Sequence, residues 1–405
     1  MHRTDRAPLL ALLCLPLLAA AAHAQRAVPA VLTGIDVIAA EGAGILEGRK
    51  VGLITNHTGR TWDGKRTIDV LRSTKGIELV ALFSPEHGLQ GALDREGIAH
   101  GTDEATGLKV WSLYGETRKP TKPMLEGLDT LVFDIQDIGC RFYTYVSTMG
   151  LALEAAAEHG LQFVVLDRPN PIDGVHMAGP VLDPGKESFV GHHTIPLRHG
   201  MTAGELMRML VGEKGIKVDA KLVPCRGWTR SMTFDRTGLP WVNPSPNMRN
   251  LTQALLYPGI GVIEGTNVSV GRGTDTPFEV VGAPWIDGIA LAAALRAAEL
   301  PGVTFVPVRF TPSSSKHEKK ECGGVQIAVT DWQTFEPVIT GIALACALRD
   351  LFGSDWKHDK LDWLLRDQAA LDAFLAGKDA RTIERGWKQE LDVFRMRRKP
   401  FLVYE

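Results

Sequence analysis

In the N-terminal half of the chain, short and almost continuously apolar runs alternate with segments of helical periodicity. Apolar runs of this kind are typical of strands that are buried on both faces. The expected strands cover residues 50–56, 77–84, 108–115, 129–137 and 162–170. Helices are expected between them over 67–73 and 144–160. This alternation predicts an α/β fold with a parallel sheet covered by helices, Rossmann-like but without a G-x-G-x-x-G or Walker loop.

The second half of the chain has a different pattern. After a region rich in Pro, Gly, Trp and Arg, the helical segment TAGELMRML begins with Thr202 as the expected N-cap and Glu205 three residues later. The turn-rich stretch WVNPSPNMRN ends this region. Strand patterns (302–310, 323–331) and helical patterns (336–353, 380–398) follow it. We therefore predict a catalytic domain over 30–250 and a smaller α+β domain over 251–405.

The first residues do not resemble the rest of the chain. Arg3 and Arg6 precede a short apolar segment that ends in Ala22-His23-Ala24, a pattern typical of a cleaved secretory signal peptide over 1–24. Cleavage predicts an exported protein, periplasmic or extracellular. No later segment is apolar enough to cross a membrane, so we expect no stable membrane insertion after cleavage.

Composition narrows the function classes further. A hydrophobic content of 44% and a charged content of 23% are ordinary for a folded soluble protein. The net charge of −2 gives no electrostatic footprint for nucleic acid. The cysteines that follow the predicted signal peptide have no metal-site spacing, and they leave open whether any disulfide forms.

Polar residues follow the carboxyl ends of four predicted strands. They are Asn56; Glu86 and His87; Asp134, Gln136 and Asp137; and Asp167, Arg168 and Asn170. In a parallel sheet these ends share one edge, and ligands bind there in the crevice where the strand order reverses. We therefore expect these side chains to converge in one pocket.

The stretch SPEHG, residues 84–88, is the leading candidate for chemistry. A carboxyl group at the end of an apolar strand loses hydration, which favours its protonated form and suits a general acid. Pro85 restricts the backbone before Glu86, and Gly88 permits a sharp exit after His87. The alternative interpretation is a surface turn with a solvated glutamate.

Other candidates also have structural alternatives. Arg141 and Tyr143 stand at the start of a predicted helix, where an anion would bind, but Asp137 and Arg141 could equally form a structural ion pair. His199 precedes a helix and, taken alone, fits a structural role as well as a catalytic one. The polar, Gly-rich stretch with Glu264, Asn267 and Arg272 suits sugar hydroxyls or an acid group, or is an irregular loop.

No metal motif, nucleophile elbow or cofactor fingerprint occurs in the sequence. A hydrolase that uses carboxylates and needs neither metal nor cofactor is the consistent interpretation.

Several long motifs resemble the exo-β-N-acetylmuramidases of the NamZ type, glycoside hydrolase family 171. They occur in the family's order: SPEHG, LYGETRKPT, VFDIQDIGCRFYTYVSTM, VVLDRPNPI, IPLRHGMTAGEL, GLPWVNPSPNM, LYPGIGVIEGTN and GRGTDTPFE. Val270, Arg249 and Leu89-Gln90 depart from the family pattern. The resemblance implies a Rossmann-like domain, a smaller C-terminal domain and an active-site cleft between them.

The resemblance also implies an activity, which is release of β-linked N-acetylmuramic acid from the non-reducing end of peptidoglycan fragments. The substrate would be a muropeptide or disaccharide, and the role would be wall turnover. Glu86 would be catalytic, with His87, Asp134 and Glu264 as further catalytic candidates. The substrate-binding candidates are Asn56, Gln136, Asp137, Arg141, Tyr143, Asp167, Arg168, Asn170, His199, Asn267 and Arg272. A non-catalytic muropeptide-binding protein and a wall amidase or esterase are the alternatives.

Overall fold

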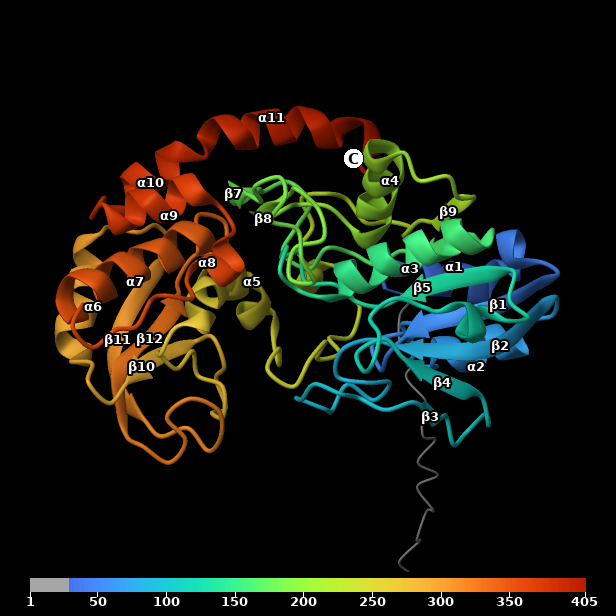
Figure 1. The fold of residues 1–405 in the computed structure, drawn as a ribbon, viewed down its shortest axis with the longest axis horizontal. Helices are drawn as coiled ribbons and strands as arrows, with labels where there is room; N and C mark the ends of the chain where they lie inside the picture. The colour runs from blue at the N-terminus through green and yellow to red at the C-terminus, as the bar shows by residue number, and fades with distance from the viewer. Residues whose placement is uncertain (1–28) are drawn as a thin grey trace, which may run out of the picture.

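The computed structural model describes residues 29–405, so the predicted signal peptide over 1–24 lies outside the described residues (Figure 1). Within residues 29–405 no helix is long and apolar enough to cross a membrane. The four cysteines of this part, Cys140, Cys225, Cys322 and Cys346, are all buried and unpaired.

The N-terminal domain is built on one seven-stranded sheet with the order β3-β4-β2-β1-β5-β6-β9. All strands pair in parallel except β3, which is antiparallel to β4 at the edge. The strands are β1 (Arg49–Thr55), β2 (Ile77–Ser84), β3 (Gly101–Thr102), β4 (Lys109–Ser112), β5 (Thr130–Asp134), β6 (Gln162–Leu166) and β9 (Ala220–Val223). Without β3, the order reverses between β1 and β5, as in the doubly wound Rossmann arrangement. The predicted parallel α/β sheet is confirmed, and β9 is a strand that the apolar pattern did not predict.

Helices cover both faces of this sheet because successive strand side chains point in opposite directions. On β5, Val132 packs with the helices α1 (Gly34–Glu41) and α2 (Thr67–Ser73). Leu131 and Phe133 face the opposite way, toward α3 (Tyr145–His159) and α4 (Ala203–Lys214). The strands are therefore buried on both faces, which explains their continuous apolar sequence.

The residues predicted to begin α4 and to end α3 do so in the structure. Thr202 caps α4 by accepting a hydrogen bond from the Glu205 amide, and the Glu205 side chain accepts from the Thr202 amide at 3.1 Å. Gly160 ends α3 in the left-handed region with φ 68°, a conformation that glycine adopts without steric cost.

The C-terminal domain has a three-stranded antiparallel sheet, with the order β10-β12-β11, packed against helices. Its strands are β10 (Val280–Ala283), β11 (Val303–Phe310) and β12 (Cys322–Val329). Its helices are α5 (Leu251–Ile260), α6 (Gly288–Ala297), α7 (Pro337–Phe352), α8 (Asp362–Leu365), α9 (Gln368–Leu375), α10 (Ala380–Gly386) and α11 (Lys388–Arg398). The segment 380–398, expected to be one helix, forms two. Helix α10 ends at Gly386, and Trp387, which is buried, separates it from α11.

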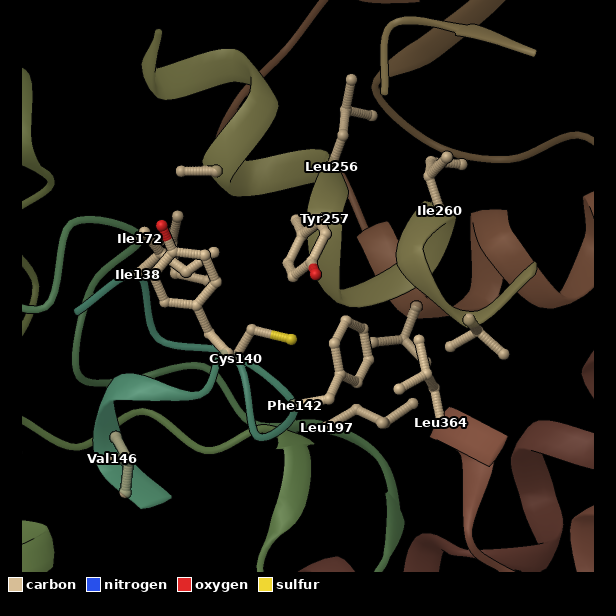
Figure 2. Packing of buried hydrophobic residues seen from close by; sticks show 14 of the residues in the cluster. Ile138, Cys140, Phe142, Val146, Ile172, Leu197, Leu256, Tyr257, Ile260 and Leu364 are labelled. Atoms are coloured by element: carbon tan, nitrogen blue, oxygen red, sulfur yellow. The ribbon is translucent and has the colours of Figure 1, made fainter. Parts of the chain in front are cut away.

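The two domains share one continuous hydrophobic core. Figure 2 shows Cys140 and Phe142 of the N-terminal domain close to Tyr257 and Ile260 of α5. Phe142 packs so closely on Gly261 that a Cβ there would lie 2.6 Å from its ring. This packing fixes the floor of the space between the domains.

The C-terminal end of the chain returns to the N-terminal domain. Helix α11 crosses from the C-terminal domain toward α4, above the hairpin of β7 (Ala178–Val181) and β8 (Pro196–Arg198) (Figure 1). At its end, Arg398 donates to the carbonyl oxygens of Gly174 and Gly200 at 3.1 and 2.7 Å. The domains are thus joined at α5 and again at α11.

Candidate active site

A cavity of about 580 Å³ lies between the carboxyl ends of β2 and β4 and the C-terminal domain. The N-terminal domain contributes Glu86, His87, Tyr114, Tyr143 and Thr144 to its walls. The C-terminal domain contributes Tyr257, Glu264, Arg272 and Lys316. The cavity therefore brings together acids, cations and phenols from segments that are far apart in sequence.

Glu86 follows β2 directly after Pro85 and is half-buried in this cavity. The Thr144 hydroxyl, next to the start of α3, donates to its Oε2 at 2.5 Å. Tyr114, which follows β4, lines the same wall near this carboxylate. Burial and the nearby charge of Glu86 raise the pKa of Tyr114, so its phenol stays neutral and able to donate. The Thr144 hydroxyl thus orients the Glu86 carboxyl group, with the Tyr114 phenol nearby at the cavity wall.

His87 is held in a fixed orientation beside Glu86. Its backbone has φ 69°, in the left-handed region that few non-glycine residues adopt. Its Nδ1 lies 2.7 Å from the Leu93 carbonyl oxygen, so Nδ1–H is the donor there. The Nε2 atom is then the acceptor in the neutral ring, which suits His87 to accept a hydrogen bond rather than to give one.

Glu264 lies on the C-terminal wall, at the end of the 3₁₀-helix η4 (Gly261–Gly265). Arg272 donates to its carboxylate, and Arg272 Nη1 also lies 3.5 Å from Asp94 of the N-terminal domain. Lys316 donates to the Glu264 carbonyl oxygen. Arg272 thus links the two walls, and Glu264 is a second carboxylate held in place within the same cavity.

Tyr143 supplies an unused donor. Its hydroxyl is buried and has no hydrogen-bond partner among residues 29–405, and the residue lines the cavity. Burial raises the pKa of this phenol, which keeps it neutral. A buried hydroxyl without a partner is costly. Because this oxygen has almost no exposed surface, it lies behind the cavity wall rather than open to a ligand.

Asp134 and Arg168, by contrast, form an ion pair away from the cavity. Asp134 is fully buried at the end of β5, and Arg168 follows the adjacent strand β6. Nε and Nη2 of Arg168 lie 2.5 and 3.0 Å from the Asp134 carboxylate, which also accepts from Thr67. These side chains fill the crevice where the strand order reverses. The larger cavity lies beside this crevice, at the carboxyl ends of β2 and β4.

Arg141 is also occupied by the protein itself. It is only 2% exposed, and its guanidinium donates to the carbonyl oxygens of Pro180, Ile195, Leu364 and Leu365 at 2.7–3.2 Å. Burial lowers its pKa to about 10, so it remains charged at neutral pH. Leu364 and Leu365 belong to α8, so Arg141 ties the two domains together through Nη1 and Nη2. Its Nε has no partner among residues 29–405 but is fully buried and lies outside the cavity lining.

Asp137 does not pair with Arg141. It accepts from the Gly139 amide at 2.7 Å and lies 3.8 Å from Nε2 of the fully buried His199. Burial raises the pKa of Asp137 to about 7 and lowers that of His199 to about 3. His199 is therefore neutral at pH 7, and its Nε2 has no hydrogen-bond partner among residues 29–405, so the two are buried neighbours rather than an ion pair.

The remaining predicted residues hold loops rather than line the cavity. Asn56 accepts from the amide and hydroxyl of Thr58, and Asp167 accepts from Thr202, Gly204 and Tyr404. Gln136, Asn170 and Asn267 bond chiefly to backbone groups. Of the predicted residues, the cavity therefore brings together Glu86, His87, Tyr143, Glu264 and Arg272.

Sequence reasoning missed several cavity residues. Tyr114 and Arg118 lie inside LYGETRKPT, one of the motifs that carry the family resemblance. Neither residue was predicted to belong to the site. Thr144 stands next to the predicted Tyr143. Lys316 lies in an exposed-looking polar stretch, SSSKHEKK, that gave no signal. Among residues 29–405, no group of three or more His, Cys, Asp and Glu side chains is placed to hold a metal ion.

Comparison with known proteins places this arrangement in a family. The N-terminal family model of the exo-β-N-acetylmuramidase NamZ matches residues 51–252, and the C-terminal model matches 255–404. Peptidoglycan β-N-acetylmuramidase NamZ of Bacillus subtilis (strain 168) is 44% identical over 380 residues, which is 93% of this chain and 92% of that protein.

Two solved structures from Bacteroides fragilis NCTC 9343, both of DUF1343 family proteins, have the same fold. One has a TM-score of 0.87 at 36% identity, and the other a TM-score of 0.77 at 32% identity. Each comparison covers 93% of this chain and 99% of the other. Both family models and a near full-length relative match, so the chain belongs to the NamZ family of exo-β-N-acetylmuramidases.

Proposed function

We propose that this protein is an exo-acting glycoside hydrolase that releases β-linked N-acetylmuramic acid from the non-reducing ends of peptidoglycan fragments, in cell-wall turnover. The observation that carries the proposal is Glu86, oriented by Thr144 in a cavity that also holds Glu264. Glycoside cleavage needs this combination of a carboxylic acid and a second group at the anomeric carbon. Family membership supplies the substrate class.

Glu86 is assigned as the general acid. Its carboxylic acid protonates the glycosidic oxygen as the bond to the anomeric carbon breaks, and the leaving sugar departs as an alcohol. The Thr144 donor at 2.5 Å fixes which carboxyl oxygen faces the sugar. His87, with Nε2 as an acceptor, is assigned to a sugar hydroxyl beside the acid.

For the second group, Glu264 and the substrate's own acetamido oxygen are the candidates. Asp134 and Asp137 drop out, because neither lines the cavity. If Glu264 is the second group, its carboxylate must face the anomeric carbon of the sugar. The ion pair with Arg272 would hold the carboxylate in one position. A substrate-assisted reaction would instead leave Glu264 to position the acetamido group.

Arg118 is assigned to the lactyl carboxylate that distinguishes muramic acid from glucosamine. Its guanidinium lies 4.2 Å from the Phe189 ring centroid and 5.1 Å from that of Tyr114. Among the described residues its one ion-pair partner is Glu96, at 3.9 Å, so most of its donors remain free for a planar anion. Arg272 and Lys316, the other cations described above, already donate to Glu264.

Hydrolysis of a chromogenic β-N-acetylmuramide tests the activity, with the matching β-N-acetylglucosaminide as the second substrate. The wild type is expected to cleave the muramide in strong preference, and Arg118→Gln is expected to reduce that preference by raising KM for the muramide alone. Binding without turnover would favour the muropeptide-binding protein, and release of peptide without release of sugar would favour the amidase.

We also propose export, supported by the N-terminal sequence pattern alone. Mass spectrometry of the mature protein recovered outside the cytoplasm is expected to show an N-terminus at Gln25, after Ala24. An uncleaved chain retained in the cytoplasm would contradict this.

A further inference from the structure

One tryptophan at the wall of the Glu86 cavity is left open to solvent. Trp363, on α8, is 46% exposed and lines this cavity. All nine tryptophans lie within residues 29–405, and the one other that is exposed, Trp332 at 39%, lies outside the cavity. Proteins normally bury most of the large apolar surface of a tryptophan. The indole of Trp363 therefore keeps an apolar face available to a ligand of this cavity.

The backbone that carries Trp363 is held firmly in place. The next two residues, Leu364 and Leu365, are buried, and their carbonyl oxygens accept from Arg141 Nη2 at 2.8 and 2.7 Å. The Trp363 carbonyl oxygen itself accepts from Arg366 Nε at 3.1 Å. An aromatic ring on a fixed support loses little conformational freedom when a ligand binds to it. The buried charge of Arg141 thus helps to present the indole.

The indole lies next to the second carboxylate of the cavity. It packs over Gly265, where an added Cβ would lie 3.3 Å from its Cε3 atom. Glu264 is the preceding residue and lines the same wall. Figure 1 shows α8 on the side of the C-terminal domain that is turned toward the N-terminal domain, which carries Glu86. A sugar chain whose reacting bond lies between the two carboxylates can therefore reach Trp363.

The cavity has a closed aromatic floor, which indicates the sugar that meets Trp363. Phe142, Tyr257 and Phe278 line this floor and are 0–7% exposed. Neighbouring rings pack edge to face, with centroids 5.0 and 4.7 Å apart. An enzyme that removes a terminal sugar binds it at the closed end, so the leaving sugar extends toward solvent. Trp363, as an exposed lining residue, stands on the path of the leaving sugar.

Polar donors lie beside the indole. Arg366 ends α8 with φ 53° and also lines the cavity. Its Nε donates to the Trp363 carbonyl oxygen, whereas Nη1 and Nη2 make no hydrogen bond within the described part of the chain. N-acetylglucosamine carries hydroxyl groups and an acetamido carbonyl around a ring whose C–H groups form an apolar face. An indole face with free guanidinium donors beside it suits a sugar of this kind.

We propose that Trp363 and Arg366 form the subsite for the leaving sugar, an N-acetylglucosamine ring whose apolar face stacks on the indole. This inference rests on the proposed glycosidase function and adds to it the residues that bind the sugar beyond the cleaved bond. Stacking there holds the glycosidic oxygen in place for Glu86. Binding energy from this part of the substrate therefore contributes to kcat/KM when the leaving group is a sugar.

The test compares two substrates that differ only in the leaving group. One is the disaccharide N-acetylmuramyl-β-N-acetylglucosamine, and the other is trifluoroethyl β-N-acetylmuramide, whose leaving group has neither a sugar ring nor an aromatic ring. Release of N-acetylmuramic acid is measured for both. In Trp363→Ala, kcat/KM for the disaccharide is expected to fall about ten-fold further than kcat/KM for the trifluoroethyl glycoside. Trp363→Phe, which keeps an aromatic face, is expected to recover most of the loss.

Trp332→Ala, which removes the exposed tryptophan outside the cavity, is the matched control and is expected to cleave both substrates as the wild type does. Equal losses on the two substrates in Trp363→Ala, no loss on the disaccharide, or a Trp363→Phe as weak as Trp363→Ala would each overturn the subsite while leaving the glycosidase in place. A wild type that releases no sugar from either substrate would instead overturn the proposed function, on which the subsite rests.

Discussion

Replacing Arg168 by methionine tests whether this arginine holds the fold or contacts the substrate. In the structure it makes two charge-assisted hydrogen bonds, of 2.5 and 3.0 Å, to Asp134, which is 0% exposed. Methionine keeps much of the side-chain volume but removes the charge and every donor. The buried Asp134 carboxylate would then have only the Thr67 hydroxyl as a side-chain partner.

The expected cost is large. Breaking a buried ion pair by removing one partner typically costs about 3–5 kcal/mol, because the other charge stays buried and unpaired. The loss of two charge-assisted hydrogen bonds, at about 1.5–3 kcal/mol each, gives a similar decrease in the free energy of unfolding. With a urea dependence of roughly 2–3 kcal/mol per M, the unfolding midpoint of the N-terminal domain is expected to fall by about 1–2 M.

Urea unfolding followed by circular dichroism measures this. Arg236→Met is the matched control, since Arg236 is exposed and forms no ion pair among the described residues. The control is expected to unfold with the wild type. A midpoint for Arg168→Met within about 0.3 M of the wild type, together with a ten-fold rise in KM, would refute the structural assignment and return Arg168 to the substrate site.

Two other perturbations follow from the geometry. In Gly91→Ala, at φ 66°, the added Cβ would lie 1.8 Å from the His57 ring and should displace the loop that carries Glu86. We therefore expect kcat to fall at least about ten-fold. The control is Gly97→Ala, at φ 70° with nothing within 4 Å of the added Cβ, which should lower the free energy of unfolding by only about 1 kcal/mol. Burial, followed by Arg398 and Arg198, lowers the pKa of His199 from 6.5 to about 3. The contribution of the neutral His199 ring to the free energy of unfolding is therefore fully present above pH 6.5. It decreases by about 1.4 kcal/mol per pH unit as the pH falls from 6.5 toward 3. Parallel urea midpoints of wild type and His199→Gln between pH 7 and pH 4.5 would contradict this.

The strands and helices of the N-terminal domain were predictable because their signals are local. Continuous apolar runs marked the buried strands, and the Thr202–Glu205 pair marked the start of α4. The break at Gly386 was not predictable in the same way, since the helical pattern continues through it. There, burial of Trp387 against the core outweighs the local propensity.

The candidate site was predictable only in part. The position of a residue at a strand end does not show whether its side chain lines the cavity or pairs with another residue of the protein. Glu86 and Asp134 both follow apolar strands, yet one lines the cavity and the other is paired. The neighbouring strands β5 and β6 bring Asp134 and Arg168 together, which adjacency in sequence could have suggested. Arg141 could not have been foreseen, because its acceptors on α8 lie 223 and 224 residues away.

The central claim is that Glu86 protonates the leaving sugar of a β-N-acetylmuramide. The most direct measurement is kcat for release of N-acetylmuramic acid from a β-linked disaccharide in Glu86→Gln, since a sugar leaving group needs the proton; Glu126→Gln, an exposed glutamate outside the cavity, is the control. Loss of the acid is expected to lower kcat by about 10²–10⁴-fold, with folding and the control unaffected. Turnover by Glu86→Gln at the wild-type rate would contradict the account.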